Sequence, residues 1–401
     1  MADPIELFQF HSSINELIPG LPHDLAMECL LRVPITSHPT LRLVSHQWKS
    51  TISNPSFFSL RRISNFAENH LFLIQPLSQS ISAEKTTIFE ESDFMDIDIE
   101  DNKQPSNGIG LPNYNLNIYN AKTEEWRCLS GLTIPTFSQC VVLSEVGKLV
   151  VLGGWDPTTL EPVSRVVVID LNLGVWKEGS PMPTARSFFA VGAPGSTTVY
   201  VAGGHDGQKN ALKSAEEYDV EHDQWKKIPP LTEERDECYG LSIFDDGKFW
   251  VISGYGTESQ GRFRSDCEVF DPEKEEWSIV TGVWPYPMKN PKSSAVVKLE
   301  GKKKWWDVNE GEVMEYDWEM RVWKGLNNMG GIPKGVNGWV SLIDVGNGKI
   351  CVMGNGENSD GERMFMLEME EENGKMNWRW IQVETPPRFL RIPFSAAHFL
   401  M

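Results

Sequence analysis

A composite pattern recurs along most of this 401-residue chain with a step close to 50 residues. Each copy has an apolar run that ends in Gly-Gly or a variant, a polar loop, a second apolar run that usually ends in Asp, and then a Trp. The glycine positions are Gly153-Gly154, Gly203-Gly204, Ser253-Gly254 and Met353-Gly354. The tryptophans are Trp126, Trp176, Trp225, Trp277, Trp323 and either Trp378 or Trp380. Six registered copies of a composite pattern indicate a repeat protein.

Each copy has room for about four short strands, because apolar runs alternate with Gly, Pro, Asn and Asp turns from residue 113 onward. A single such sheet cannot bury both of its faces, so the six sheets are expected to close into a ring. The recurrent Trp fills the gap between neighbouring sheets, and its N–H needs a partner. The paired glycines allow positive φ where the sheets crowd together. We predict a mainly β fold, a six-bladed β-propeller over residues 70–401, preceded by a small all-α unit.

The two ends of the propeller are predicted to meet. The first repeat lacks the strand that opens the others, such as residues 187–191, and residues 394–399 match that strand. We therefore expect the C-terminal segment 394–399 to be the innermost strand of blade one. Blade five departs from the pattern, because Lys302 to Asp307 stand where a glycine pair is expected.

An acidic segment interrupts the first repeat. Residues 90–101 carry seven acids and no base. Self-repulsion and few apolar residues make residues 79–112 a poor core former, so we predict a disordered insert. Either a solvated loop or a docking segment for a basic partner fits this composition.

Helical patterning is confined to residues 15–62, after a tail of residues 1–14. Pro22 suits the first turn of a helix, Leu21, Leu25 and Cys29 recur at a spacing of four, and Pro34 ends the helix. Short helices fit residues 39–44 and 46–52. A unit of this size buries little surface alone, so its core is expected to be completed by a partner or by the propeller.

The charge balance restricts the partners. Lys plus Arg number 37 and Asp plus Glu 56, a formal net charge of −19. Nucleic acids and anionic membranes attract basic faces, so neither is an expected partner. The first residues do not resemble a signal peptide, no apolar run is long enough to span a membrane, and the six scattered cysteines form no CxxC pair. These features predict a location in the cytoplasm, the nucleus or both.

The helical segment resembles an F-box, and the repeats resemble kelch repeats. The matching helical residues are Leu21-Pro22, Asp24, Leu25, Leu30-Leu31, Leu41-Arg42, Val44-Ser45 and Trp48-Lys49. Together they resemble the plant F-box/kelch family over almost the whole chain. The resemblance implies a substrate receptor of an SCF-type ubiquitin ligase, in which the F-box binds a Skp-type adaptor and through it a cullin–RING ligase. The kelch ring then holds a target protein for ubiquitination and proteasomal degradation.

The same resemblance implies which residues bind the adaptor. They are Leu21, Pro22, Leu25, Leu30, Leu31, Val33, Pro34, Leu41, Val44 and Trp48. The segments 186–190 and 234–238 are similar to a subgroup that targets phenylalanine ammonia-lyase, an enzyme of phenylpropanoid metabolism, and cytokinin-response regulators.

A candidate target-binding rim follows from blade topology. In a four-stranded antiparallel blade, the loop after the second strand and the loop between blades lie on the same face. The rim residues expected on this basis are Trp155, Arg186, His205, Arg235, Tyr255 and Asn355. A mixed aromatic and cationic surface suits protein recognition. Alternatively, Arg186 and Arg235 form structural ion pairs between blades.

Enzyme functions also occur on kelch rings, in copper oxidases and iron-dependent specifier proteins. Metal chemistry needs convergent ligands, and no pair of histidines here has ligand spacing. Neither a nucleophile elbow nor a nucleotide-binding glycine motif is present. We therefore predict a non-catalytic adaptor with no cofactor and no metal. A kelch scaffold without a ligase role, and a kelch metalloenzyme, remain the alternatives.

Overall fold

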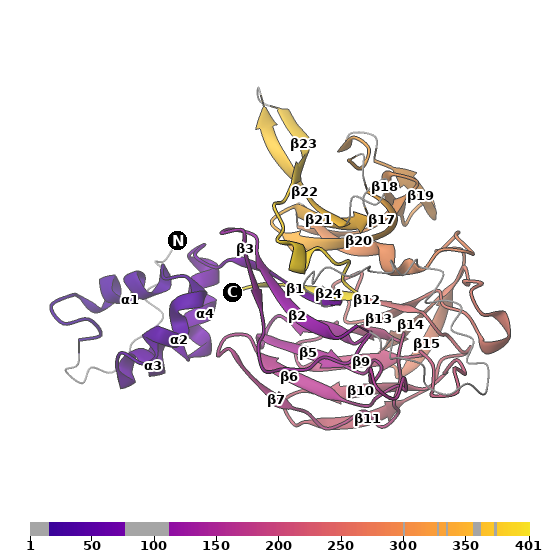
Figure 1. Cartoon of the computed structure of the whole chain (residues 1–401), viewed down its shortest axis with the longest axis horizontal. Helices are drawn as coiled ribbons and strands as arrows, with labels where there is room; N and C mark the ends of the chain where they lie inside the picture. Colours follow the sequence, from indigo (N-terminus) through magenta and orange to yellow (C-terminus); the bar gives the residue numbers. More distant parts are fainter. Residues whose placement is uncertain are drawn as a thin grey trace, which may run out of the picture.

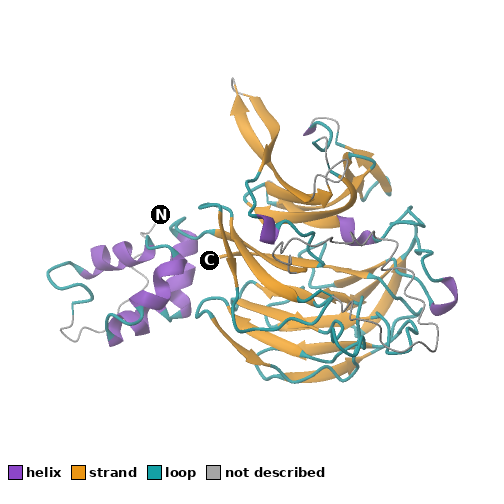
Figure 2. Cartoon of the chain, viewed as in Figure 1, coloured by secondary structure: helices purple, strands orange, loops and turns teal. Residues whose placement is uncertain are grey.

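The computed structural model describes residues 16–76, 112–299, 301–326, 329–333, 336–355, 362–372 and 375–401. Four helices form a module at one end of the molecule, and six four-stranded sheets are arranged as blades around a common axis (Figure 1, Figure 2). The predicted six-bladed propeller with a small helical unit is confirmed. The predicted tail 1–14, and all but the last residue of the predicted insert 79–112, lie outside the described residues.

The blades follow the chain in order. Blade one holds β24 (Ser395–Leu400), β1 (Asn69–Pro76), β2 (Tyr114–Asn120) and β3 (Glu125–Cys128). Blade two holds β4 (Gln139–Leu143), β5 (Lys148–Leu152), β6 (Val166–Asp170) and β7 (Val175–Glu178). Blade three holds β8 (Ala190–Gly192), β9 (Thr198–Ala202), β10 (Ala215–Asp219) and β11 (Gln224–Ile228). Blade four holds β12 (Tyr239–Leu241), β13 (Phe249–Ile252), β14 (Cys267–Asp271) and β15 (Glu276–Val280). Blade five holds β16 (Ser294–Leu299), β17 (Lys302–Asn309), β18 (Glu312–Asp317) and β19 (Val322–Gly325). Blade six holds β20 (Asn337–Gly346), β21 (Lys349–Asn355), β22 (Glu362–Glu372) and β23 (Lys375–Gln382).

Blade one takes its innermost strand from the C-terminus. β24 pairs antiparallel with β1, with Leu71 opposite His398 and Leu73 opposite Ala396. Beyond the strand, the backbone N–H of Met401 donates to the carbonyl of Glu68 at 3.0 Å. The two ends of the propeller are therefore held in one sheet.

The core is distributed between neighbouring blades. Phe72 and Leu116 of blade one share a buried cluster with Leu149 and Val167 of blade two, and similar clusters follow around the ring. The second strand of a blade is covered on both faces, so in β5 the run from Leu149 to Leu152 is wholly buried. By contrast, every residue of the outermost strand β7 is exposed. Burial on both faces explains the continuous apolar runs that precede the glycine pairs.

The glycine pairs adopt the expected backbone. Gly203 has φ +70° and Gly204 has φ +82°, and a Cβ on Gly203 would collide with the carbonyl of Arg235 in the next blade. In blade five, Glu310 (φ +49°) and Gly311 (φ +80°) instead make a two-residue turn between β17 and β18. Such a turn matches the twist of a hairpin, so blade five has no long loop at this end.

The helical module packs against one face of the propeller. Its helices are α1 (His23–Leu31), α2 (His38–Leu41), α3 (His46–Ile52) and α4 (Pro55–Ile63). Pro22 is the N-cap residue of α1, with ψ 144°. It therefore lies one residue before the first turn in which it was predicted. The residue range predicted for the third helix, 46–52, is confirmed by α3. The predicted range 39–44 extends past the end of α2 at Leu41 into a turn.

The module docks on the turns that follow the first and third strands of blade two. Arg42 donates to the carbonyls of Asn172 and Leu173 at 2.5 and 2.8 Å, and Arg62 donates to that of Ser144 at 3.2 Å. Ile35 packs against the cluster between blades one and two. The loops that follow the second strands, and the loops between blades, lie on the opposite face of the ring.

Candidate recognition site

Five side chains converge on the axis of the propeller at the face opposite the helical module. We call this set the mouth ring; its members are Phe137, Phe188, Glu237, Lys292 and Phe394. Each stands one or two residues before the innermost strand of its blade. Three of them, Phe137, Phe188 and Glu237, have positive φ between 49° and 60°. Such a conformation is uncommon for non-glycine residues and tends to mark functional positions.

The three phenylalanines of the mouth ring form a triangle. The ring centroids of Phe137 and Phe188 lie 5.0 Å apart, those of Phe137 and Phe394 5.1 Å, and those of Phe188 and Phe394 5.2 Å. Their interplanar angles of 46°, 58° and 80° suit aromatic packing. Phe188 and Phe394 remain partly exposed, so the triangle presents an apolar floor to solvent.

Lys292 completes the ring with a cation over aromatic faces. Its Nζ lies 3.3 Å from the ring centroid of Phe394 and 5.0 Å from that of Phe188. The atom is buried and has no hydrogen-bond partner among the described residues. Burial lowers the pKa of Lys292 to about 7, against the attraction of Glu237. The amine is therefore poised to change charge near neutral pH.

Glu237 lies close to Lys292 but is occupied by other donors. Its Oε1 accepts from the Tyr255 hydroxyl at 2.7 Å, and its Oε2 accepts from Asn290 Nδ2 at 2.9 Å. Burial, reinforced by the charge of Asp236, raises the pKa of Glu237. The carboxylate is thus held in place by neutral donors.

A second polar layer supports the mouth ring from behind. Trp155 Nε1 donates to Nε2 of His205 at 3.2 Å, and Nδ1 of His205 lies 2.9 Å from Asp236 Oδ1. These two bonds require a neutral imidazole whose proton is on Nδ1. The ring of His205 stacks on Phe188 with centroids 5.4 Å apart. The layer therefore orients Phe188.

The six residues predicted for the rim do not form an exposed surface. Trp155, His205 and Tyr255 are buried in the supporting layer, where each pairs through its backbone with a residue just before an innermost strand. Arg186 and Arg235 are completely buried. Asn355 alone is exposed, at the end of β21. The expectation that all six residues present their side chains to a partner was therefore wrong for the five buried ones.

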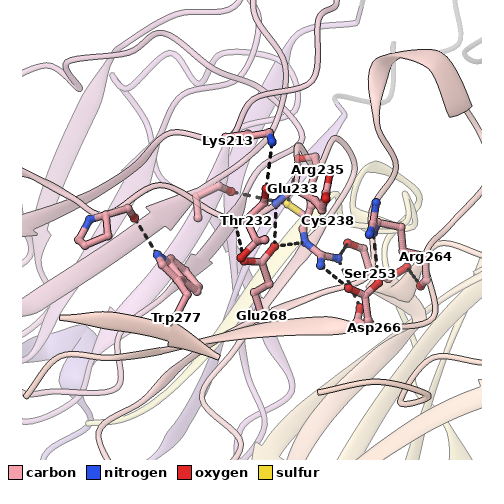
Figure 3. Close-up of polar contacts among 12 residues, drawn as sticks. Lys213, Thr232, Glu233, Arg235, Cys238, Ser253, Arg264, Asp266, Glu268 and Trp277 are labelled. Carbon is pink, nitrogen blue, oxygen red and sulfur yellow. Dashed lines mark hydrogen bonds and ion pairs between the residues drawn. The ribbon is translucent and has the colours of Figure 1, made fainter. Parts of the chain in front are cut away.

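Arg235 shows why the arginines are internal (Figure 3). Its Nη1 donates to the carbonyl of Ser253 at 2.7 Å, its Nε to Glu268 at 3.0 Å, and its Nη2 to Asp266 at 2.7 Å. All three partners belong to its own blade. Arg186 repeats the arrangement in blade three, with Nη2 3.1 Å from Glu216. The alternative of structural ion pairs is therefore the one observed, although the pairs lie within blades rather than between them.

Sequence reasoning missed the mouth ring because its members differ chemically. The available signal was positional: Phe137, Phe188, Glu237 and Lys292 each stand two residues before an innermost strand. This common position can be recognised only once the bounds of the innermost strands are known.

On the helical module, the predicted adaptor-binding residues divide into two groups. Leu30 and Leu31 are buried in the core of the module, and Leu21, Val33, Leu41 and Trp48 are partly buried. Trp48 Nε1 donates to the carbonyl of Leu17 at 2.6 Å, which ties α3 to the start of the module. Pro22, Pro34, Leu25 (47% exposed) and Val44 (59%) face solvent. Leu43, which the motif comparison did not select, is 85% exposed.

Two further kinds of site are absent from the described residues. No group of three or more His, Cys, Asp or Glu side chains in these ranges could hold a metal ion. Within the same ranges, no helix has the length and apolarity needed to cross a membrane.

Comparisons with known proteins agree with this architecture. The F-box domain model matches residues 18–60 and the Kelch motif model matches residues 185–232. The F-box/kelch-repeat protein SKIP20 of Arabidopsis thaliana is 38% identical over 96% of this chain and 96% of its own length. The F-box/kelch-repeat protein At2g44130 of the same plant is 38% identical over 96% of this chain and 95% of its own length. A chain that shares this identity over nearly its full length, with a helical module and a six-bladed ring at the matching positions, belongs to the F-box/kelch-repeat family.

Proposed function

We propose that this protein is the substrate-recognition subunit of an SCF-type ubiquitin ligase. The observation that supports this role is the exposed apolar surface of the helical module, made by Pro22, Leu25, Leu43 and Val44. We call these four side chains the exposed apolar patch of the module, and exposed apolar groups on so small a unit suit a protein interface. The module would bind a Skp-type adaptor there and, through it, a cullin–RING ligase.

Target capture is assigned to the propeller face that carries the mouth ring. This face lies opposite the turns that contact the module, so a target bound there does not compete with the adaptor. Phenylalanine ammonia-lyase and cytokinin-response regulators are the first candidate targets, on the resemblance of segments 186–190 and 234–238. Those segments contain Phe188 and Glu237 of the mouth ring.

The protein would act by proximity and carry out no chemistry itself. It would hold a target near a ubiquitin-loaded enzyme supplied by the ligase, in the cytoplasm, the nucleus or both. A kelch scaffold without a ligase role is the second candidate, and the experiment below separates the two.

Adaptor binding tests the proposal directly. The change is Leu25→Asp combined with Leu43→Asp, which places two charges in the exposed apolar patch. Because a few apolar anchors carry most interface energy, we expect the affinity for a purified Skp-type adaptor to fall by at least roughly thirtyfold, equivalent to about 2 kcal/mol. Isothermal titration calorimetry measures this change.

Ile63→Asp provides a matched control. Ile63 is 67% exposed on α4, the helix of the module that lies next to the propeller (Figure 1). We expect this variant to bind the adaptor as the unsubstituted chain does. Undiminished binding by the double variant, or no binding by the unsubstituted chain, would refute the receptor role and favour the scaffold.

A further inference from the structure

The mouth ring contains a buried amine that has no hydrogen-bond acceptor among the described residues. Nζ of Lys292 is enclosed by Phe188 and Phe394 and makes no hydrogen bond among the described residues. A buried amine that lacks a partner costs free energy, so its position against two aromatic rings at the mouth of the propeller needs an explanation. A ligand that supplies the missing acceptor is one such explanation.

Among the described residues, the titratable groups around Lys292 do not supply that acceptor. Glu237 already receives two hydrogen bonds, from Tyr255 and Asn290. Asp236 is engaged by His205, and the Cys238 thiol, whose pKa is raised by burial to about 11, is itself directed at backbone carbonyls. These three groups are the titratable neighbours that act on Lys292. Each stabilises its charge at a distance without bonding to it.

The chemistry of the site favours a single negative charge beside an apolar group. A carboxylate would make a charge-assisted bond to Nζ, while a neighbouring apolar side chain would rest on the exposed faces of Phe188 and Phe394. A dianionic phosphate fits less well, because Glu237 adds negative charge near the amine and the Nη groups of Arg186 and Arg235 are bonded within their own blades.

We propose that the mouth ring binds an acidic side chain, Asp or Glu with an adjacent apolar residue, on the captured target, and that Lys292 Nζ is its partner. The inference rests on the proposed role in target capture. Access requires a rotamer change of Phe394, whose ring covers Nζ and is itself partly exposed. The whole chain carries a net charge of −19, so it repels an acidic ligand at long range, and only Lys292 attracts the carboxylate at short range. Because a buried ion pair is screened little, added salt should not weaken the contact.

A peptide titration tests this assignment on the full chain without the adaptor. The probe is the blocked dipeptide N-acetyl-glutamyl-leucine amide, and its glutaminyl counterpart is the uncharged match. Lysines are ¹³C-dimethylated, and the Lys292 resonance is identified by its loss in Lys292→Met. We expect the glutamyl peptide to shift this resonance and to bind at least tenfold more tightly than the glutaminyl peptide.

The pH dependence supplies a second readout. Because the ammonium form holds the carboxylate, bound peptide should raise the pKa of Lys292, and affinity should fall as pH rises through the bound-state value. Lys292→Met should abolish the preference for the glutamyl peptide without lowering the melting temperature, since Met suits a phenylalanine cage. Lys298 is an exposed lysine on the following strand β16, and Lys298→Met should leave the preference for the glutamyl peptide unchanged.

Three results would overturn the inference. One is equal binding of the two peptides, another is unaltered binding by Lys292→Met, and the third is tighter binding of the phosphoseryl analogue than of the glutamyl peptide. Failure of the receptor role is distinguishable, because loss of adaptor binding is measured separately and does not affect the peptide titration on the chain alone.

Discussion

At the scale of residues, Arg186 of blade three and Arg235 of blade four occupy equivalent positions but differ in how their buried charges are compensated. Both are fully buried and both donate to backbone carbonyls of the strand ends beside them. Burial lowers the pKa of Arg186, which has a single carboxylate partner, Glu216. Burial also acts on Arg235, but Asp266 and Glu268 outweigh it and raise its pKa. Blade four therefore depends on a more fully compensated charge cluster.

Replacing Arg235 should be strongly destabilising. Arg235→Met leaves Glu268 buried without its cation, and we expect the free energy of unfolding to fall by roughly 3–5 kcal/mol. Urea denaturation followed by tryptophan fluorescence measures this loss. Addition of Glu268→Gln should recover part of it, because the amide oxygen can still accept from the Thr232 N–H without carrying a charge.

Arg264→Met is the matched control for Arg235→Met. Arg264 pairs with the same Asp266 at 3.1 Å but is 36% exposed (Figure 3). A partly exposed pair contributes about 1 kcal/mol or less. Comparable losses in the two variants would contradict the argument that burial determines the effect.

At the scale of elements, the outermost strands are tied inward by their tryptophans. Trp225 Nε1 donates to the carbonyl of Ser180 at 2.8 Å, Trp277 Nε1 to that of Pro229 at 2.7 Å, and Trp323 Nε1 to that of Val283 at 2.9 Å. Trp380, rather than Trp378, repeats the bond with Met329 at 3.2 Å. Each acceptor lies in the connection from the preceding blade. In blades three to six the recurrent Trp thus links an outer strand to its neighbouring blade, and its indole N–H has the expected partner. In blade one, the buried Trp126 Nε1 has no hydrogen-bond partner among the described residues.

Truncation of one such Trp should have a larger effect than truncation of an exposed one. Trp225 also stacks on Tyr218, with centroids 4.7 Å apart and rings at 20°. Trp225→Ala removes this stack and the interblade bond, and we expect a loss of about 2–3 kcal/mol in unfolding free energy. Calorimetric unfolding provides the measurement. Trp176→Ala, at a site 39% exposed, serves as the comparison, and an equal loss there would contradict the proposed link.

At the scale of the whole molecule, the helical module and the ring are joined by more than the chain. Arg42 and Arg62 donate to carbonyls of blade two, and the backbone of Glu68 pairs with that of Met401, just beyond the closing strand. The exposed apolar patch of the module and the mouth ring consequently lie at opposite ends of the molecule in one orientation. For a protein that acts by proximity, this geometry sets where a captured target stands relative to the ligase.

Loosening the docking should broaden that geometry. Cys29 on the module and Cys128 on blade one are exposed, whereas the other four cysteines are buried, so spin labels attach at two defined places. Double electron–electron resonance should give a narrow distance distribution in the unsubstituted chain. Arg42→Ala with Arg62→Ala should broaden it while adaptor affinity stays constant.

Arg32→Ala is the control for this measurement, because Arg32 pairs with Glu28 on the surface of α1. It should leave the distribution narrow. An unchanged distribution in the double variant would mean that contacts such as those of Ile35 hold the module by themselves.

Sequence alone determined the architecture, because each repeat carries local requirements that only one arrangement satisfies. The continuous apolar runs need cover on both faces, the glycine pairs need positive φ, and a first repeat with three strands needs a fourth from the C-terminus. The sequence pattern from Leu21 to Trp48 likewise predicted the helical module. What tertiary structure decided is which side chains are accessible. By position, Arg186, Arg235 and Trp155 were predicted to be surface groups. The two arginines are instead buried among later strands of their own blades, and Trp155 is buried against His205 of the next blade. The mouth ring likewise depends on the tertiary structure, because its three phenylalanines, its glutamate and its lysine come from five different blades and meet only at the axis.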